Sequence, residues 1–216
     1  MGKLLIFDFD GTIVDTITDV GLCFNEALRE NGFPQHPLEA FGAFVGGDLE
    51  TVVSRMLPEQ ARSPENIDRV KTVYRRLYLS NPKPNTKPYP GIMQVLAQLK
   101  ASGHHLAVNS NKGQALLEDL VRKLFPADFF ESVVGYEETR PSKPSPAGVD
   151  LICSQCRCER KQAVYIGDGH SDIETAVNAG IPCVLVKWGQ GTQQDFADVR
   201  VADFVETASQ LYEALA

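Results

Sequence analysis

The sequence predicts an α/β fold, with a doubly wound, mostly parallel sheet and an all-helical subdomain inserted after the first strand. Short apolar runs, typical of strands buried on both faces, recur along the chain. Segments with helical apolar spacing alternate with these runs, which favours a parallel sheet covered by helices. Between about residues 16 and 86 only helical spacing occurs, so this stretch is expected outside the sheet.

The strand predictions rest on apolar runs with polar boundaries. The first is the run from Lys3 to Asp8, in which the four residues 4–7 are all apolar. Later runs share this pattern: 105–109, 132–135, 163–167 and 183–186, with a weaker candidate at 202–205.

Helices are expected between these strands, because apolar residues recur there every three or four positions. Two such stripes are Ile92, Val95, Leu96 and Leu99, then Leu117, Leu120, Val121 and Leu124. Three more lie in the insertion: Val20, Cys23, Phe24 and Ala27; Leu49, Val52, Val53 and Met56; Ile67, Val70, Tyr74 and Leu77. The proline-rich segment 81–91 is expected to be a stiff linker back to the sheet. We therefore expect a core of residues 1–15 and 87–216 and a helical subdomain of residues 16–86.

The composition is that of an ordinary soluble globular protein, with 43% hydrophobic and 23% charged residues. No apolar stretch approaches the roughly 18 residues of a membrane span, and residues 4–7 are too few for a secretory signal. We expect a cytoplasmic monomer or homodimer that does not bind membranes. The net charge of -7 argues against a nucleic-acid partner.

Five cysteines in a chain without a predicted secretion signal are expected to be reduced thiols. The spacing of Cys153, Cys156 and Cys158 resembles part of a zinc site, but no further ligands with suitable spacing are visible. The alternative is the end of a helix and the turn after it.

Polar residues follow several predicted strands. Asp8 and Asp10 end the first strand, residues 109–112 the second, and residues 167–172 the fourth, while the loop after the third carries Lys143. Ligand sites of parallel open sheets form outside the carboxyl ends of the strands, so these groups should converge. Clustered carboxylates need a cation, and an oxygen-only ligand set favours Mg²⁺. An aspartate can attack phosphorus, so the cluster is typical of a phosphoryl-transfer site.

Residues 7–15, Phe-Asp-Phe-Asp-Gly-Thr-Ile-Val-Asp, resemble the first motif of the haloacid dehalogenase superfamily of hydrolases. Ser110, Lys143 in a Lys-Pro-x-Pro setting, and Asp168 with Asp172 resemble the second, third and fourth motifs, in that order. The resemblance implies a Rossmann-like core with a type-1 helical cap, a Mg²⁺ cofactor and a phosphatase activity on a small phosphorylated metabolite.

The resemblance also assigns catalytic and metal-binding roles. Asp8 would be the nucleophile, and Asp10 would protonate the leaving oxygen and then activate water. Asp8, Asp10 through its carbonyl, and Asp168 would bind Mg²⁺. Asp172 would bind the ion directly or position a water on it.

Other residues have both a functional and a structural interpretation. Ser110, Asn111 and Lys143 would bind phosphoryl oxygens, although Ser110 could instead cap the helix expected near residue 114 and Lys143 could be a surface charge. Asp15 is interpreted as structural. His170 is a position that varies in the family and is interpreted as a spectator rather than a substrate contact.

The substrate is expected to be 2-phosphoglycolate, because the loop with Gly46 and Gly47 resembles the specificity loop of phosphoglycolate phosphatases. Asp10 argues against a dehalogenase, in which no leaving oxygen needs a proton. No lysine lies between residues 4 and 70 for the Schiff base of a phosphonoacetaldehyde hydrolase. A pyrophosphatase, a nucleotidase and a sugar-phosphate phosphatase or mutase remain open, as does an interaction module without catalysis.

Overall fold

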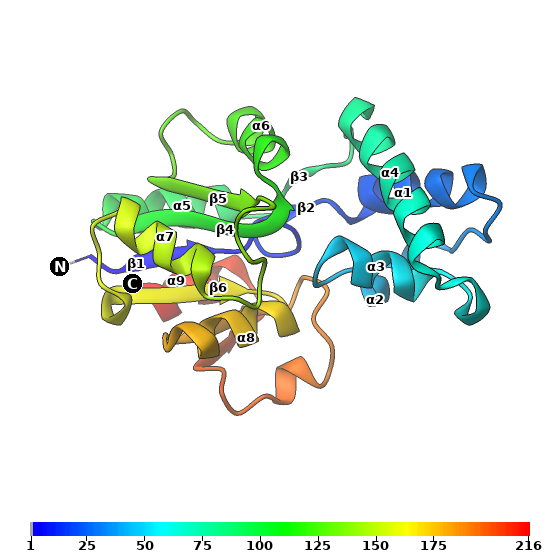
Figure 1. Cartoon of the computed structure of the whole chain (residues 1–216). Helices are drawn as coiled ribbons and strands as arrows, with labels where there is room; N and C mark the ends of the chain where they lie inside the picture. Colours follow the sequence, from blue (N-terminus) through cyan, green and yellow to red (C-terminus); the bar gives the residue numbers. More distant parts are fainter. Residues whose placement is uncertain (1) are drawn as a thin grey trace. The chain divides into compact units, whose positions relative to one another are not determined.

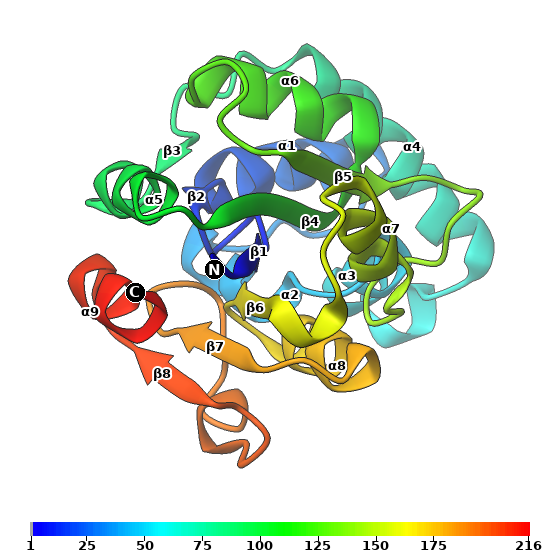
Figure 2. The same ribbon diagram turned by 90° about the vertical axis from the view of Figure 1, so that its left-hand side faces the viewer.

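A six-stranded parallel sheet forms the centre of the larger of the two units into which the chain divides (Figure 2). The computed structural model describes residues 2–216. The strands are β1 (Leu4–Phe7), β4 (His105–Gly113), β5 (Ser132–Tyr136), β6 (Ala163–Gly167), β7 (Cys183–Val186) and β8 (Asp203–Val205). Their order is β5-β4-β1-β6-β7-β8, and every neighbouring pair is parallel. The predicted fold class is confirmed.

Helices cover both faces of this sheet, because its central strand is apolar on both sides. Leu5 and Phe7 of β1 belong to one buried cluster, and Leu4 and Ile6 belong to another. The first cluster includes side chains of α5 (Ile92–Ala101), α6 (Gln114–Leu124) and α9 (Ala208–Leu215). The second includes side chains of α7 (Ala147–Gln155) and α8 (His170–Ala179).

β4 is longer than the sequence predicts. We expected its end at Asn109, but the strand continues to Gly113, which pairs with Tyr136 after an irregularity in the register. Residues 110–112 are polar, so no apolar pattern marked them as strand. The extension matters because these residues stand at the carboxyl edge of the sheet.

The second unit, Asp15–Thr86, is built from helices. They are α1 (Ile17–Glu30), η1 (Leu38–Ala40), α2 (Phe41–Phe44), α3 (Leu49–Met56), η2 (Glu59–Ala61) and α4 (Pro64–Ser80) (Figure 1). Phe24 of α1 stacks on Tyr74 of α4 with ring centroids 3.7 Å apart, which joins the two longest helices of the unit. The short strands β2 (Val14–Asp15) and β3 (Lys87–Pro88) pair with each other where the chain passes from one unit to the other.

A buried carboxylate connects the beginning of the second unit to its end. Asp19 in the first turn of α1 accepts hydrogen bonds from the backbone and side-chain nitrogens of Asn85, at 3.0 and 2.9 Å, and from Oγ1 of Thr86 at 2.7 Å. The beginning and the end of the insertion are therefore tied together by three hydrogen bonds to one side chain.

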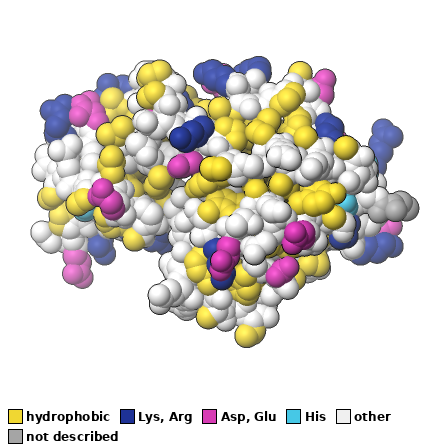
Figure 3. Space-filling view, turned by 180° about the vertical axis from the view of Figure 1, so that it is seen from behind, with side chains coloured by type: hydrophobic (Ala, Val, Ile, Leu, Met, Phe, Trp, Pro, Cys, Tyr) yellow, Lys and Arg dark blue, Asp and Glu magenta, His cyan; other side chains and the backbone are white. Residues whose placement is uncertain are grey.

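The sequence predicts neither a membrane span nor a broad basic surface. Within residues 2–216, the chain contains no helix that is both long and apolar enough to span a bilayer. On the face shown in Figure 3, lysine and arginine side chains are dispersed among acidic and apolar ones and do not form one basic patch.

Candidate active site

The chain runs outward from β1 to β4 and β5, and then outward from β6 to β7 and β8 on the other side, so the crevice expected of such a sheet lies at the carboxyl ends of β1 and β6. Polar side chains at the carboxyl ends of β1, β4 and β6 and in the loop after β5 are buried near this crevice. The exposed fraction is below one tenth for each of Asp8, Ser110, Lys143, Asp168 and Asp172. Charged side chains are rarely buried to this extent unless they are paired, so the contacts among these side chains define the site.

Lys143 is the cation at the centre of the cluster. Its Nζ lies 2.8 Å from Oδ1 of Asp8 and 2.7 Å from Oδ1 of Asp172. Burial alone would lower the pKa of Lys143, but the charges of Asp172 and Asp8 raise it well above its ordinary value. The amine is therefore protonated at neutral pH.

The carboxylates are poorly compensated by this one charge. Burial, with a smaller contribution from Asp172, raises the pKa of Asp8 from 3.8 to about 7, even though Lys143 lowers it. Burial and the charges of Asp172 and Asp8 raise the pKa of Asp168 well above its ordinary range. Three acidic groups beside one lysine leave negative charge that a second cation would neutralise.

The donor set fits a hard divalent cation. Carboxylate oxygens of Asp8, Asp168 and Asp172 all lie within 4.8 Å of one another, and they are the only group of three or more acidic, histidine or cysteine ligands of this kind within residues 2–216. Oxygen ligands without thiolate or imidazole are those that Mg²⁺ prefers.

The Asp168 carboxylate is held from two sides. Its Oδ2 accepts a hydrogen bond from the backbone N of Gln190 at 2.6 Å, and its Oδ1 accepts one from Oγ1 of Thr12 at 3.4 Å. The Nε1 of Trp188 donates to the carbonyl of Thr12 at 3.0 Å, which connects the loop after β7 to the first motif. Sequence reasoning did not identify Trp188 or Gln190, because the sequence carries no signal for a contact between residues so far apart.

Asp172 is also fixed through both oxygens. Oδ1 faces Lys143, and Oδ2 accepts hydrogen bonds from the backbone N of Asp168 and of Gly169 at 3.1 and 3.3 Å. Asp172 stands in the first turn of α8, where a negative charge also interacts favourably with the helix dipole.

A tight turn after β1 presents Asp10. The backbone N of Gly11 bonds to the carbonyl of Val14, and the N of Val14 bonds to the carbonyl of Phe9. Gly11 has a φ of +84°, a conformation that favours glycine, and a Cβ there would lie 2.3 Å from Oδ2 of Asp168. The Oδ1 of Asp10 lies 3.2 Å from Nζ of Lys112, a second lysine in the site to which sequence reasoning gave no role.

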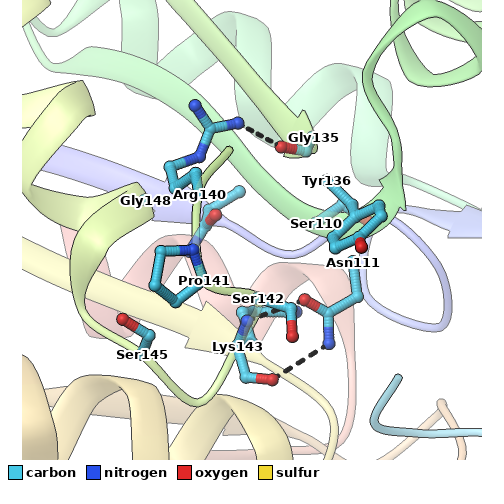
Figure 4. Close-up of a pocket in the computed structure, with 11 residues that line it drawn as sticks. Ser110, Asn111, Gly135, Tyr136, Arg140, Pro141, Ser142, Lys143, Ser145 and Gly148 are labelled. Carbon is cyan, nitrogen blue, oxygen red and sulfur yellow. Dashed lines mark hydrogen bonds between the residues drawn. The ribbon is translucent and has the colours of Figure 1, made fainter. Parts of the chain in front are cut away.

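Figure 4 shows how the end of β4 meets the loop that carries Lys143. The side chain of Asn111 accepts a hydrogen bond from the backbone N of Lys143 at 2.8 Å and donates one to its carbonyl at 3.2 Å. Asn111 thus holds the backbone of the lysine. The Oγ of Ser110 accepts from the backbone N of Lys112 at 3.2 Å, and α6 has Gly113 as its N-cap, so Ser110 does not cap that helix.

His170 lies at the surface beside the cluster. Its side chain is 72% exposed, with ring nitrogens 3.7 Å from Asp195 and 3.9 Å from Glu174. Asp15 accepts a hydrogen bond from the backbone N of Ile17 at 3.3 Å, which is the structural role expected of it.

The cysteines are free thiols and do not form a metal site among residues 2–216. Cys153 lies in α7, Cys156 is its C-cap, and Cys158 follows in the turn, where its Sγ donates to the carbonyl of Cys156. The helix-end interpretation of this segment is confirmed.

Gly46 and Gly47 lie in the second unit, between α2 and α3. Both have a positive φ, +100° and +95°. Arg55 donates hydrogen bonds to the carbonyls of Phe44 and Gly46 at 3.1 and 2.8 Å, so this loop has a defined shape.

Comparison with known proteins begins with a family model described as haloacid dehalogenase-like hydrolase, which matches residues 5–186. A phosphoglycolate phosphatase of Aquifex aeolicus is 31% identical over 208 residues, which cover 94% of this chain and 95% of the relative. A phosphoglycolate phosphatase of Psychrobacter arcticus is 29% identical, with 99% and 95% of the two chains covered.

A solved structure shows the same fold. The crystal structure of a protein from Lactobacillus delbrueckii subsp. bulgaricus, with a provisional assignment as a phosphoglycolate phosphatase, has a TM-score of 0.92, 29% identity and coverage of 99% of this chain and 98% of its own. Because the family match spans most of the chain, the protein belongs to the haloacid dehalogenase-like hydrolases, and within them it is a phosphatase similar to the phosphoglycolate phosphatases.

Proposed function

We propose that this protein is a Mg²⁺-dependent phosphomonoester hydrolase that works through an aspartyl-phosphate on Asp8, with 2-phosphoglycolate as its substrate. The observation that carries the proposal is the buried Asp8 beside Lys143, within a cluster of three carboxylates. Asp8, Asp168 and Asp172, with the carbonyl of Asp10, would hold the ion. When bound, the ion would supply positive charge that neutralises the carboxylates and the phosphoryl oxygens.

In the first step, an oxygen of Asp8 forms a bond to phosphorus while the bond from phosphorus to the leaving oxygen breaks. Asp10 gives a proton to that oxygen, so the product leaves as an alcohol. Lys143, which is protonated and already 2.8 Å from Asp8, orients the nucleophile and offsets the charge of the phosphoryl group.

In the second step, Asp10, now ionised, removes a proton from water as the water oxygen attacks phosphorus. The bond between phosphorus and Asp8 breaks, which returns Asp8 as a carboxylate and releases phosphate. The side chain of Asp10 is 32% exposed, so water can reach it, whereas the nucleophile is nearly buried.

The choice of 2-phosphoglycolate rests on the similarity to phosphoglycolate phosphatases and on the defined loop at Gly46 and Gly47 in the helical unit. Residues 15–86 would act as a cap that selects the substrate. Cytoplasmic location and a monomeric or homodimeric state remain predictions from the sequence.

The proposal is tested by phosphate release from 2-phosphoglycolate, pyrophosphate, hexose phosphates and nucleotides, each with Mg²⁺ and with EDTA. We expect the highest kcat/KM for 2-phosphoglycolate and no turnover in EDTA. Asp8→Asn should reduce turnover roughly 10³-fold or more, because it removes the nucleophile. The control Asp68→Asn changes an exposed aspartate of α4 and should be fully active. A higher kcat/KM for another ester would replace 2-phosphoglycolate as the assigned substrate. An active Asp8→Asn variant would refute the mechanism.

A further inference from the structure

Lys112 is a buried cation beside Asp10. Its side chain is 7% exposed, and its Nζ lies 3.2 Å from Oδ1 of Asp10, whose own side chain is 32% exposed. A lysine usually keeps its ammonium group in water, and desolvating it is unfavourable unless a negative charge compensates. The amine is therefore turned inward, toward the carboxylate that the proposed mechanism uses for proton transfer.

The backbone of Lys112 is fixed, so the direction of its side chain is also constrained. Its N donates to Oγ of Ser110. Its carbonyl packs against Gly135 of β5, where a Cβ would lie only 2.7 Å from the carbonyl oxygen. This close approach occurs in the part of β4 that extends beyond the predicted strand, between Asn109 and Gly113.

Asp10 reaches the site from a turn rather than from a strand, and its carboxylate is more exposed than those of Asp8 and Asp172. A partly exposed carboxylate can rotate about its side-chain torsions unless it is held. An ion pair to Oδ1 restricts that rotation and thereby sets the direction of Oδ2. Proton transfer requires such alignment, since a displacement of about 1 Å can cost roughly 10²-fold in rate.

We propose that Lys112 is a positioning residue that orients Asp10 for proton transfer to the leaving oxygen and from water. This inference rests on the proposed function, because it assigns Lys112 a role through Asp10. It differs from the role of Lys143, which contacts Asp8 and Asp172.

The first test compares Lys112→Met, which keeps the length of the side chain without its charge, with Lys112→Arg, which keeps a cation. The control Lys123→Met removes an exposed lysine that pairs with Asp119 on α6. With 2-phosphoglycolate, Lys112→Met should lower kcat roughly 10- to 100-fold, a loss within the ~10²–10⁴ range of general acid–base catalysis. KM should change less than about threefold, Lys112→Arg should recover part of the rate, and the control should match the wild type. A large rise in KM with unchanged kcat would overturn the proposal in favour of a substrate contact.

Two further readouts separate positioning from a general structural effect. With p-nitrophenyl phosphate, whose leaving group needs little protonation, the effect of Lys112→Met on aspartyl-phosphate formation should shrink. In an Asp10→Asn background, Lys112→Met should cause no additional loss, since its effect passes through Asp10. Equal losses in the rate of aspartyl-phosphate formation for both esters, or additive losses in the double variant, would overturn the proposal.

A crystal structure of Lys112→Met decides the same point without any turnover. We expect the Asp10 carboxylate to leave its wild-type rotamer while Asp8, Lys143 and Asp172 stay in place. An unchanged Asp10 would refute the role of Lys112. If the wild type released no phosphate from any ester, the proposed function would fail, and the crystal structure would still test the positioning.

Discussion

At the scale of single residues, the site is dominated by an excess of buried negative charge. Lys143 contacts Asp8 and Asp172, and Asp168 accepts hydrogen bonds from Thr12 and the backbone of Gln190. The folded protein therefore opposes ionisation of Asp8, a group that must be ionised in order to attack phosphorus. The repulsion among these carboxylates destabilises the folded protein when no metal is bound. The same repulsion increases the affinity of the site for a cation.

The raised pKa of Asp8 predicts how the stability of the metal-free protein depends on pH. Between 3.8 and about 7, the folded protein holds this proton more tightly than the unfolded chain, so the free energy of unfolding falls as the pH rises. Asp8→Asn mimics the protonated group. In EDTA it should raise the free energy of unfolding, by about 1–3 kcal/mol more at pH 8 than at pH 5. Calorimetry at both pH values checks this, with Asp68→Asn as the neutral control. A destabilised Asp8→Asn variant at pH 8 would contradict the charge argument.

Asn111 gives a second prediction at this scale. Its amide makes two hydrogen bonds to the backbone of Lys143, so Asn111→Leu should destabilise the protein by about 1–3 kcal/mol in urea unfolding. Asn178 is a matched control, because its exposed amide donates one hydrogen bond to the carbonyl of the adjacent Pro144. Asn178→Leu should cost less than about 1 kcal/mol. An equal loss in the free energy of unfolding for the two variants would show that the two hydrogen bonds to the backbone of Lys143 do not stabilise the protein more than the single one from Asn178.

At the scale of elements, the strands were predictable because burial on both faces leaves an unmistakable apolar run, as at residues 4–7. The ends of strands were less predictable. The polar residues 110–112 remain in β4 because pairing with β5 resumes at Gly113 after an irregularity in the register, which is a non-local cause. The converging aspartates and Lys143 were predictable from their places after strands. The ion pair from Lys112 to Asp10 was not, since it depends on side-chain direction.

The end of β6 and the turn that follows it offer a test with a control two residues away. At Gly167 an added Cβ would lie 2.2 Å from Cβ of Asp172, whereas at Gly169 it would meet nothing within 4 Å. Gly167→Ala should therefore destabilise the protein by about 1–3 kcal/mol and weaken Mg²⁺ binding, because Asp172 must move. Gly169→Ala should change stability by no more than about 0.5 kcal/mol. Urea unfolding and calorimetric Mg²⁺ titration measure both effects, and a harmful Gly169→Ala would contradict this account.

At the scale of the whole molecule, folding and cation binding should be coupled. The carboxylates converge only when β1, β6 and α8 are assembled, so an unfolded chain offers no comparable site. A ligand that binds only the folded state at 100 times its Kd stabilises that state by about 2.7 kcal/mol. For a chain of this size we expect Mg²⁺ at that excess to raise the melting temperature by about 5–10 °C.

The measurement is a thermal melt with Mg²⁺ and with NaCl of equal ionic strength, which separates binding from screening. Asp168→Asn should lose most of the Mg²⁺-dependent shift while keeping its stability in EDTA, because it removes one ligand and one repelling charge together. Asp195 is a buried aspartate of the same unit that accepts hydrogen bonds from Thr192 and lies outside the cluster. Asp195→Asn should therefore keep the full shift, even if its baseline melting temperature is lower. An equal shift in wild type and Asp168→Asn would mean that the cation binds elsewhere, and the stability of the fold would then be independent of the site that the three aspartates form.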